Sequence, residues 1–95
     1  FTNSYFLGDS LTDCCASGRF TQNNQPTYAD RLPGLIGASY TPTLRTNSAV
    51  GGAQSGFVNI TPFVDNLRGE QTGLLAQAQR FRNSGLVFNP NDIAG

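Results

Sequence analysis

The stretch SYFLGDSLTD, residues 4–13, contains the clearest structural signal in the chain. Its first four residues form a short apolar run that ends at Gly8-Asp9-Ser10, and this pattern is typical of a buried strand followed by a tight turn. In open parallel sheets, ligands and reacting groups gather at the carboxyl ends of the strands. We therefore expect Ser10 to lie at the functional edge of such a sheet.

The rest of the chain is predicted to alternate helices and strands. A polar loop over residues 18–25 precedes a helix that begins at Pro26 and is kinked or ended early by Pro33. Further along, the patterns predict a short edge-like strand over residues 41–46, an amphipathic helix over residues 66–81 and a strand over residues 86–88. This order of elements predicts an α/β fold with a parallel sheet.

A second small-residue turn follows the expected strand over residues 41–46. It contains Gly51-Gly52, so it and Ser10 are expected at the same edge of the sheet. A hydroxyl beside backbone N–H donors is what acyl transfer requires, since the donors stabilise the oxyanion that develops on the substrate. Taken alone, a Gly-Asp-Ser turn is also common loop chemistry.

Several segments resemble, in order, the GDSL family of SGNH hydrolases. Residues 5–13 resemble the first block of the family, and PTYADRL at residues 26–32 resembles the Pro-x-Tyr-Ala-x-x-Leu helix of its lipase and esterase branch. NSAVGGA at residues 47–53 resembles the second block, commonly Asn-x-Ala-x-Gly-Gly-Ala, and residues 74–77 and 89–91 are similar to the stretch before the third. The resemblance implies that residues 1–95 are the amino-terminal part of one three-layer α/β/α, flavodoxin-like hydrolase domain.

The resemblance also implies the roles of individual residues. Ser10 matches the nucleophile, and its own backbone N–H would be one oxyanion donor. Gly52 is the best match for a second N–H donor, with Gly51 as the neighbouring possibility, although both could be simple turn glycines. Gly8, Asp9 and Asn47 belong to the motifs as supporting residues. Asp9 and Asp13 are expected to accept local N–H bonds or to cap the following segment.

Two later blocks of the family are not securely present. Asn91-Asp92 could be aligned with the Gly-x-Asn-Asp block, but Asn89 stands where its glycine should be, so we interpret residues 89–92 as a turn before a strand. The chain contains no His, so the Asp-x-x-His block is missing. We therefore expect an inactive piece of an esterase, completed by further polypeptide with that block. The alternative is a non-catalytic binding or assembly chain.

The composition of the chain further limits the kinds of function that are expected. Six Arg balance six acidic residues, and a net charge of zero gives no sign of nucleic-acid binding. No run is long enough to span a bilayer. Adjacent Cys14 and Cys15 fit no zinc spacing and are expected to be free, partly buried thiols.

The expected chemistry needs no metal or organic cofactor. The ester could be a short-chain ester, a phospholipid or an acetylated sugar. A composition without Met or Lys, in a chain that starts at Phe1 as if processed, is typical of a mature exported bacterial protein, secreted, periplasmic or at the cell surface. A cytosolic or fungal origin stays open.

Overall fold

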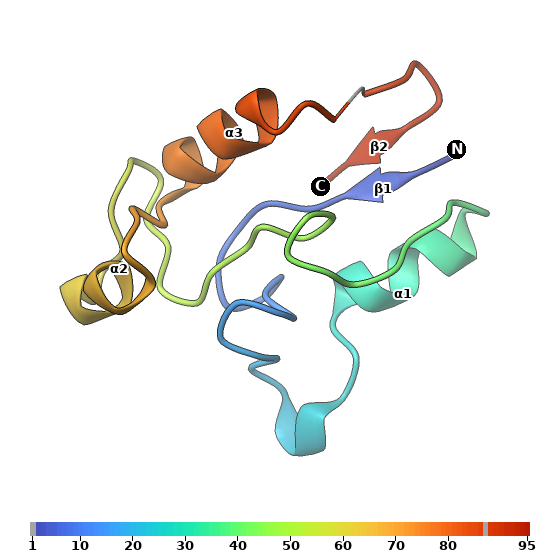
Figure 1. The fold of residues 1–95 in the computed structure, drawn as a ribbon. Helices are drawn as coiled ribbons and strands as arrows, with labels where there is room; N and C mark the ends of the chain where they lie inside the picture. Colours follow the sequence, from blue (N-terminus) through green and yellow to red (C-terminus); the bar gives the residue numbers. More distant parts are fainter. Residues whose placement is uncertain (1, 87) are drawn as a thin grey trace.

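Two short parallel strands lie at the centre of the fold. The computed structural model describes residues 2–86 and 88–95. Strand β1 (Ser4–Tyr5) pairs with β2 (Ile93–Ala94), with Ser4 opposite Ile93. Figure 1 shows the two arrows side by side and pointing the same way. The expected strand at the start of the chain and the expected parallel pairing are both confirmed.

A third extended segment, residues 46–50, runs beside the chain that continues from β1. Phe6 and Asn47 form a parallel bridge, and the Ser48 N–H donates to the Phe6 carbonyl over 2.9 Å. Two residues later, the Val50 N–H donates to the Gly8 carbonyl over 3.1 Å. Because the two segments run in parallel, the turns that follow them emerge at the same end of the sheet.

Helices pack on both faces of β1, since successive residues of a strand point to opposite sides. Tyr5 contacts Phe81 of α3 (Leu74–Asn83) with ring centroids 5.2 Å apart. Its neighbour Phe6 contacts Tyr28 of α1 (Tyr28–Leu35) at 6.0 Å. In Figure 1, α3 is drawn above the strands and α1 below them. The fold is therefore mixed α/β with a two-stranded parallel sheet.

Helix α1 confirms the helix expected after Pro26, with Tyr28 as its first residue and Pro33 accommodated inside it. The Thr27 N–H donates to the Asp30 carboxylate over 2.8 Å and fixes the start of the helix. Arg19 also donates to Asp30, at 2.7 Å, and this pairing holds the pKa of the Asp30 carboxyl below its usual value. The loop before α1 contains one short 3-10 turn, η1 (Gln22–Asn24).

The strand expected over residues 41–46 is wrong, because this segment forms a turn. The Asn47 N–H donates to the Thr43 carbonyl over 2.8 Å, and the Thr46 hydroxyl donates to the Thr41 carbonyl over 2.6 Å. Threonine hydroxyls that bind nearby backbone offer the chain an alternative to ladder pairing. The turn lies between two places where the chain pairs with the β1 segment, at Ser39 before it and at Asn47 after it.

The single helix expected over residues 66–81 is also wrong, because the chain forms two helices. Helix α2 (Pro62–Arg68) ends at Gly69, whose φ of 69° is left-handed, and α3 begins five residues later. The buried face differs as well. Ala76 and Gln77 are buried, whereas Leu74 and Leu75 are 39% and 48% exposed. From this buried face, Gln77 reaches the turn after β1.

The strand expected over residues 86–88 includes Val87, which lies outside the described residues, and Leu86 and Phe88 are not in a strand. The turn expected over residues 89–92 is confirmed. The Asp92 N–H donates to the Asn89 carbonyl, and the Asn89 N–H donates to the Asp92 carboxylate, each over 2.9 Å. Strand β2 follows this turn directly. Within the part of the chain that the structure describes, the helices are too short and too polar to cross a membrane.

Candidate active site

The first-block turn carries Ser10 in a partly buried position immediately after the sheet. The Asp9 carbonyl accepts N–H bonds from Thr12 at 3.0 Å and from Asp13 at 2.9 Å. The Asp9 carboxylate accepts the Leu11 N–H over 3.1 Å. Among residues 2–86 and 88–95, nothing accepts a hydrogen bond from the Ser10 N–H. The hydrogen bonds to Asp9 thus fix the turn around Ser10, and the Ser10 N–H is available to a ligand.

Gln77 of α3 holds the peptide groups of Gly8 from the side. Its side-chain oxygen accepts the Gly8 N–H and its amide nitrogen donates to the Gly8 carbonyl, each over 2.8 Å. The same nitrogen donates to the Thr72 carbonyl over 2.9 Å. Sequence reasoning missed this role of Gln77. The available signal was a glutamine next to Ala76, at a position on the buried face of an otherwise amphipathic helix.

The Asp13 carboxylate joins the first-block turn to the second. It accepts backbone N–H bonds from Cys15 at 3.0 Å and Ala16 at 3.1 Å, and also from Ser17. Its other contact reaches across the fold, because Oδ2 accepts the Gly51 N–H over 2.9 Å. The side chain is fully buried. Asp13 therefore does more than the local capping that the sequence suggested.

Asn47 makes a second link between the two blocks. Its amide nitrogen donates to the Thr12 carbonyl over 2.8 Å and to the Tyr40 hydroxyl over 3.0 Å. Its side-chain oxygen accepts the Ala49 N–H over 3.1 Å. Since Asn47 is fully buried, these bonds fix the position of the second segment against the Ser10 turn.

The two glycines of the second block differ in what their N–H groups can do. The Gly51 N–H is occupied by Asp13, and the Gly51 carbonyl accepts the Asn59 side chain over 2.8 Å. The Gly52 N–H has no acceptor within the described residues, and Gly52 has a φ of 83°. Of the two, Gly52 is the one whose N–H can reach a ligand.

A polar network holds the loop that follows Gly52. The Asn59 amide nitrogen donates to the Thr72 hydroxyl over 3.1 Å, and the Thr72 hydroxyl donates to Asp65, which also accepts the Asn59 N–H over 3.0 Å. Burial raises the pKa of the Asp65 carboxyl, but the hydrogen bonds from Thr72 and Asn59 outweigh it and hold the pKa below its usual value. Asp65 is therefore charged at neutral pH and anchors the loop at Asn59.

A hollow of about 270 Å³ opens beside the Ser10 turn. It is lined by Gly8, Asp9, Ala53, Gln54, Ser55 and Leu74. We call it the rim hollow. It joins residues of the first block to those that immediately follow the second.

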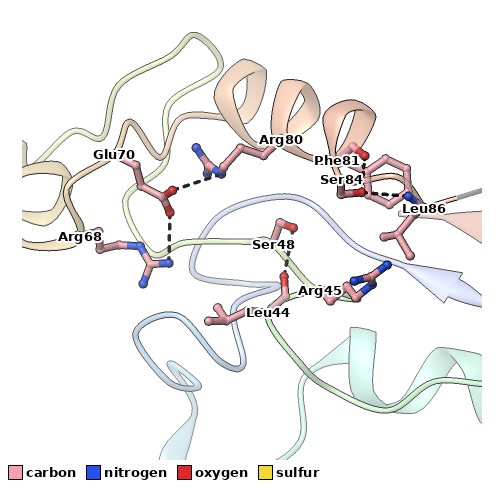
Figure 2. A pocket seen from close by; sticks show the side chains of 9 residues that line it. All are labelled: Leu44, Arg45, Ser48, Arg68, Glu70, Arg80, Phe81, Ser84 and Leu86. Carbon is pink, nitrogen blue, oxygen red and sulfur yellow. Dashed lines mark hydrogen bonds and ion pairs between the residues drawn. The ribbon is translucent and has the colours of Figure 1, made fainter.

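Another hollow, of about 240 Å³, lies between α3 and the turn over residues 43–46. Figure 2 shows Arg68 and Arg80 pointing toward Glu70, with N–O distances of 3.4 and 3.7 Å, and Arg45 on the other side. None of its lining residues belongs to the Ser10 or Gly52 turns. Of these two hollows, the rim hollow is the one that adjoins the Ser10 turn.

Cys14 and Cys15 are joined by a disulfide, so the expectation of free thiols is wrong. The Asp13 carboxylate binds the N–H groups of Cys15, Ala16 and Ser17, so it holds the backbone at this disulfide and directly after it. No group of three His, Cys, Asp or Glu side chains gathers as a metal site within residues 2–86 and 88–95.

Comparison with known proteins gives no match to a family model, a curated protein or a solved structure. The resemblance to the GDSL family therefore stays a prediction from the sequence motifs. The catalytic roles of Ser10 and Gly52 are predictions as well.

Proposed function

We propose that this chain is the amino-terminal part of an SGNH-type serine ester hydrolase in which Ser10 forms the acyl-enzyme. One observation carries the proposal. The Ser10 turn and the Gly52 turn follow parallel segments, are joined through Asp13, and each offers an N–H without an acceptor in the described residues. Two such N–H donors near a serine can form the core of an oxyanion hole.

In the proposed reaction, the Ser10 hydroxyl attacks the ester carbonyl and gives its proton to a His, which passes it to the departing alcohol. The N–H groups of Ser10 and Gly52, with an Asn side chain, stabilise the oxyanion. Each such donor typically lowers the barrier by about 3 kcal/mol. Water then cleaves the acyl-enzyme. The scheme uses no cofactor.

The His, the Asp that orients it and the third oxyanion donor come, in this proposal, from polypeptide outside these 95 residues, because the chain itself contains no His. That polypeptide also completes the three-layer domain. The composition supports an exported location for the enzyme.

The absence of His also favours a second candidate, a binding or assembly chain that keeps the front of the fold without catalysis. The two candidates differ in one property of the gene product. If its intact mass and sequence include an Asp-x-x-His segment, the hydrolase is supported. If the mature protein ends without one, the binding chain is supported.

The direct test of function uses an ester substrate and a fluorophosphonate probe on the full-length protein. We expect the probe to modify Ser10 and Ser10→Ala to abolish hydrolysis while circular dichroism stays unchanged. Ser48→Ala is the matched control, since within the described residues the Ser48 hydroxyl donates only to the Leu44 carbonyl, over 3.3 Å. Probe attachment to another serine, or full activity in Ser10→Ala, would refute the nucleophile assignment.

A further inference from the structure

We propose that the hollow lined by Arg45, Arg68 and Arg80 binds a small dianionic oxyanion, either a phosphate monoester or a dicarboxylate. We call it the arginine hollow. None of its lining residues belongs to the Ser10 or Gly52 turns, so this second site is separate from the proposed hydrolytic one and does not need its chemistry. Charge, hydrogen-bond donors and volume identify the ligand.

The fold concentrates positive charge at the arginine hollow. The whole chain has six basic and six acidic residues, and three of the arginines line this hollow with one carboxylate, that of Glu70. They come from separate segments, since Arg45 follows α1, Arg68 ends α2 and Arg80 belongs to α3. Arg80 also helps to hold the pKa of Asp65 below its usual value. Even with Asp65 included, positive charges outnumber negative ones, so the hollow attracts anions.

Glu70 neutralises Arg68 and Arg80 only in part. One of its carboxylate oxygens lies 3.4 Å from Arg68 and the other 3.7 Å from Arg80 (Figure 2). Strong guanidinium–carboxylate pairs have N–O distances of about 2.7 to 2.9 Å and form two parallel bonds. The pair of Arg19 and Asp30 in this same chain comes closer to that geometry, with two bonds of 2.7 and 3.0 Å. Arg68 and Arg80 therefore keep donors for a better-placed oxyanion.

Guanidinium donors at this hollow lack good acceptors within residues 2–86 and 88–95. Arg45 forms no ion pair there, and the buried Nε of Arg68 has no hydrogen-bond acceptor. The other bonds go to backbone carbonyls, from Arg68 to Ala16 over 3.5 Å and from Arg80 to Gln71. A guanidinium presents five N–H donors, and one oxyanion can accept two of them at once. These donors favour a ligand with several acceptor oxygens.

The other walls and the volume of the arginine hollow favour a small ligand with a short carbon chain. Leu44, Phe81 and Leu86 also line the hollow (Figure 2), and apolar surroundings strengthen the attraction between a guanidinium and an oxyanion. The volume of about 240 Å³ equals that of roughly eight water molecules, at about 30 Å³ each. The hollow therefore holds one compact ligand of about eight non-hydrogen atoms.

The test measures the Kd of two ligands of that size, propyl phosphate and succinate, for the full-length protein by isothermal titration calorimetry at constant low ionic strength. We expect at least one of them to bind with a Kd below about 1 mM, and the tighter one identifies the kind of oxyanion. Arg45→Gln, at an exposed position, should weaken this binding about tenfold because it removes a charged donor. Arg45→Lys should restore only part of the affinity, since an ammonium group lacks the planar fork.

Arg82→Gln is the matched control, because it removes the same charge from an exposed position of α3 outside the arginine hollow and should leave the Kd unchanged. Glu70→Gln should tighten binding several-fold, since it frees Arg68 and Arg80 from a competing carboxylate. A merely structural role of Glu70 would give no such gain.

Three results would overturn the proposal. They are a Kd above about 1 mM for both ligands, equal weakening by Arg45→Gln and Arg82→Gln, and binding that neither Arg45→Gln nor Glu70→Gln changes. Each would leave the proposed hydrolase unaffected, because the probe reaction at Ser10 tests that function separately.

Discussion

Three buried polar side chains, Asp13, Asn47 and Gln77, organise the backbone of the candidate site. Each of them binds backbone groups from a segment distant in the sequence. A buried backbone donor or acceptor that loses its partner costs about 1 to 3 kcal/mol. The Ser10 and Gly52 turns are therefore held rigidly, and a rigid arrangement of N–H donors is what stabilises a developing oxyanion most effectively.

The first residue-scale prediction concerns Gly52. We expect Gly52→Val to lower turnover about a hundredfold or more, because a side chain there tilts the N–H away from the acyl oxygen. The structure adds a second cause. A Cβ at this position would lie 2.5 Å from Asn59 Oδ1, and the φ of 83° is strained for any residue with a side chain. Turnover must therefore be measured per folded molecule, with the folded fraction determined by circular dichroism.

Gly85→Val separates the two causes, because Gly85 has a φ of 79° and nothing within 4 Å of an added Cβ. The Gly85→Val variant has the same kind of backbone strain but no contact at the oxyanion hole. We expect it to cost stability and to leave turnover per folded molecule unchanged. Near-parent turnover in folded Gly52→Val protein would refute the oxyanion role of Gly52.

The sequence revealed the role of those residues whose type is required by the local backbone conformation. Gly8 has a φ of 148°, and a Cβ added there would lie 2.9 Å from Thr12 Oγ1, so its motif position has a structural reason. Asp13 and Gln77 were not recognised in their full roles, because their partners, Gly51 and Gly8, are distant in the sequence. Periodicity reports which face of a helix is apolar, and it cannot identify a polar side chain that binds backbone across the fold.

Helix α3 links the whole site at the scale of elements. Its first turn holds the loop over residues 54–57, and its Gln77 holds the segment before Ser10. We predict that Gln77→Glu will destabilise the protein by about 3 kcal/mol and reduce turnover, because a carboxylate cannot donate to the Gly8 carbonyl and is itself buried. Urea unfolding and steady-state kinetics of the full-length protein measure the two effects.

Gln79→Glu provides the matched comparison, since it makes the same chemical change two residues away on the exposed side of α3. It should leave both stability and turnover within error of the parent. If Gln77→Glu and Gln79→Glu behave alike, the proposed role of α3 in holding the nucleophile turn is wrong.

Elements were predictable where local pattern and tertiary pairing agree, as in β1 and α1. Residues 41–46 are rich in β-forming types, but the hydroxyls of Thr43 and Thr46 close a turn instead. The stretch over residues 66–81 has one helical pattern, yet left-handed Gly69 and the contact of Gly73 with the loop backbone divide it. Strand β2 has two residues, which is too short for any periodicity to reveal.

Exposed apolar surface is the main feature of the whole molecule. The core is formed around Phe6, which is 2% exposed. Many large apolar side chains stay outside that core, and among them Leu35 is 81% exposed, Leu67 74% and Ile60 68%. A two-stranded parallel sheet is also smaller than most sheets of this class, which usually have about four to six strands.

We predict that residues 1–95 expressed alone will not unfold cooperatively. Ordering this chain costs more conformational entropy than the burial of so few side chains offsets. Urea titration followed by circular dichroism should give a broad, shallow change, and addition of the polypeptide with the Asp-x-x-His segment should sharpen it. A steep sigmoidal transition of the isolated monomer would show that the chain is a stable domain by itself.

The oxyanion hole proposed for the Ser10 and Gly52 turns can be examined in a single experiment. It is a crystal structure of the full-length protein after reaction with a fluorophosphonate, in which the phosphonyl oxygen occupies the place of the oxyanion. We predict phosphorus bonded to Ser10 Oγ, with that oxygen about 2.7 to 3.1 Å from the backbone nitrogens of Ser10 and Gly52. An adduct on another serine, or an oxygen that contacts neither nitrogen, would contradict the account.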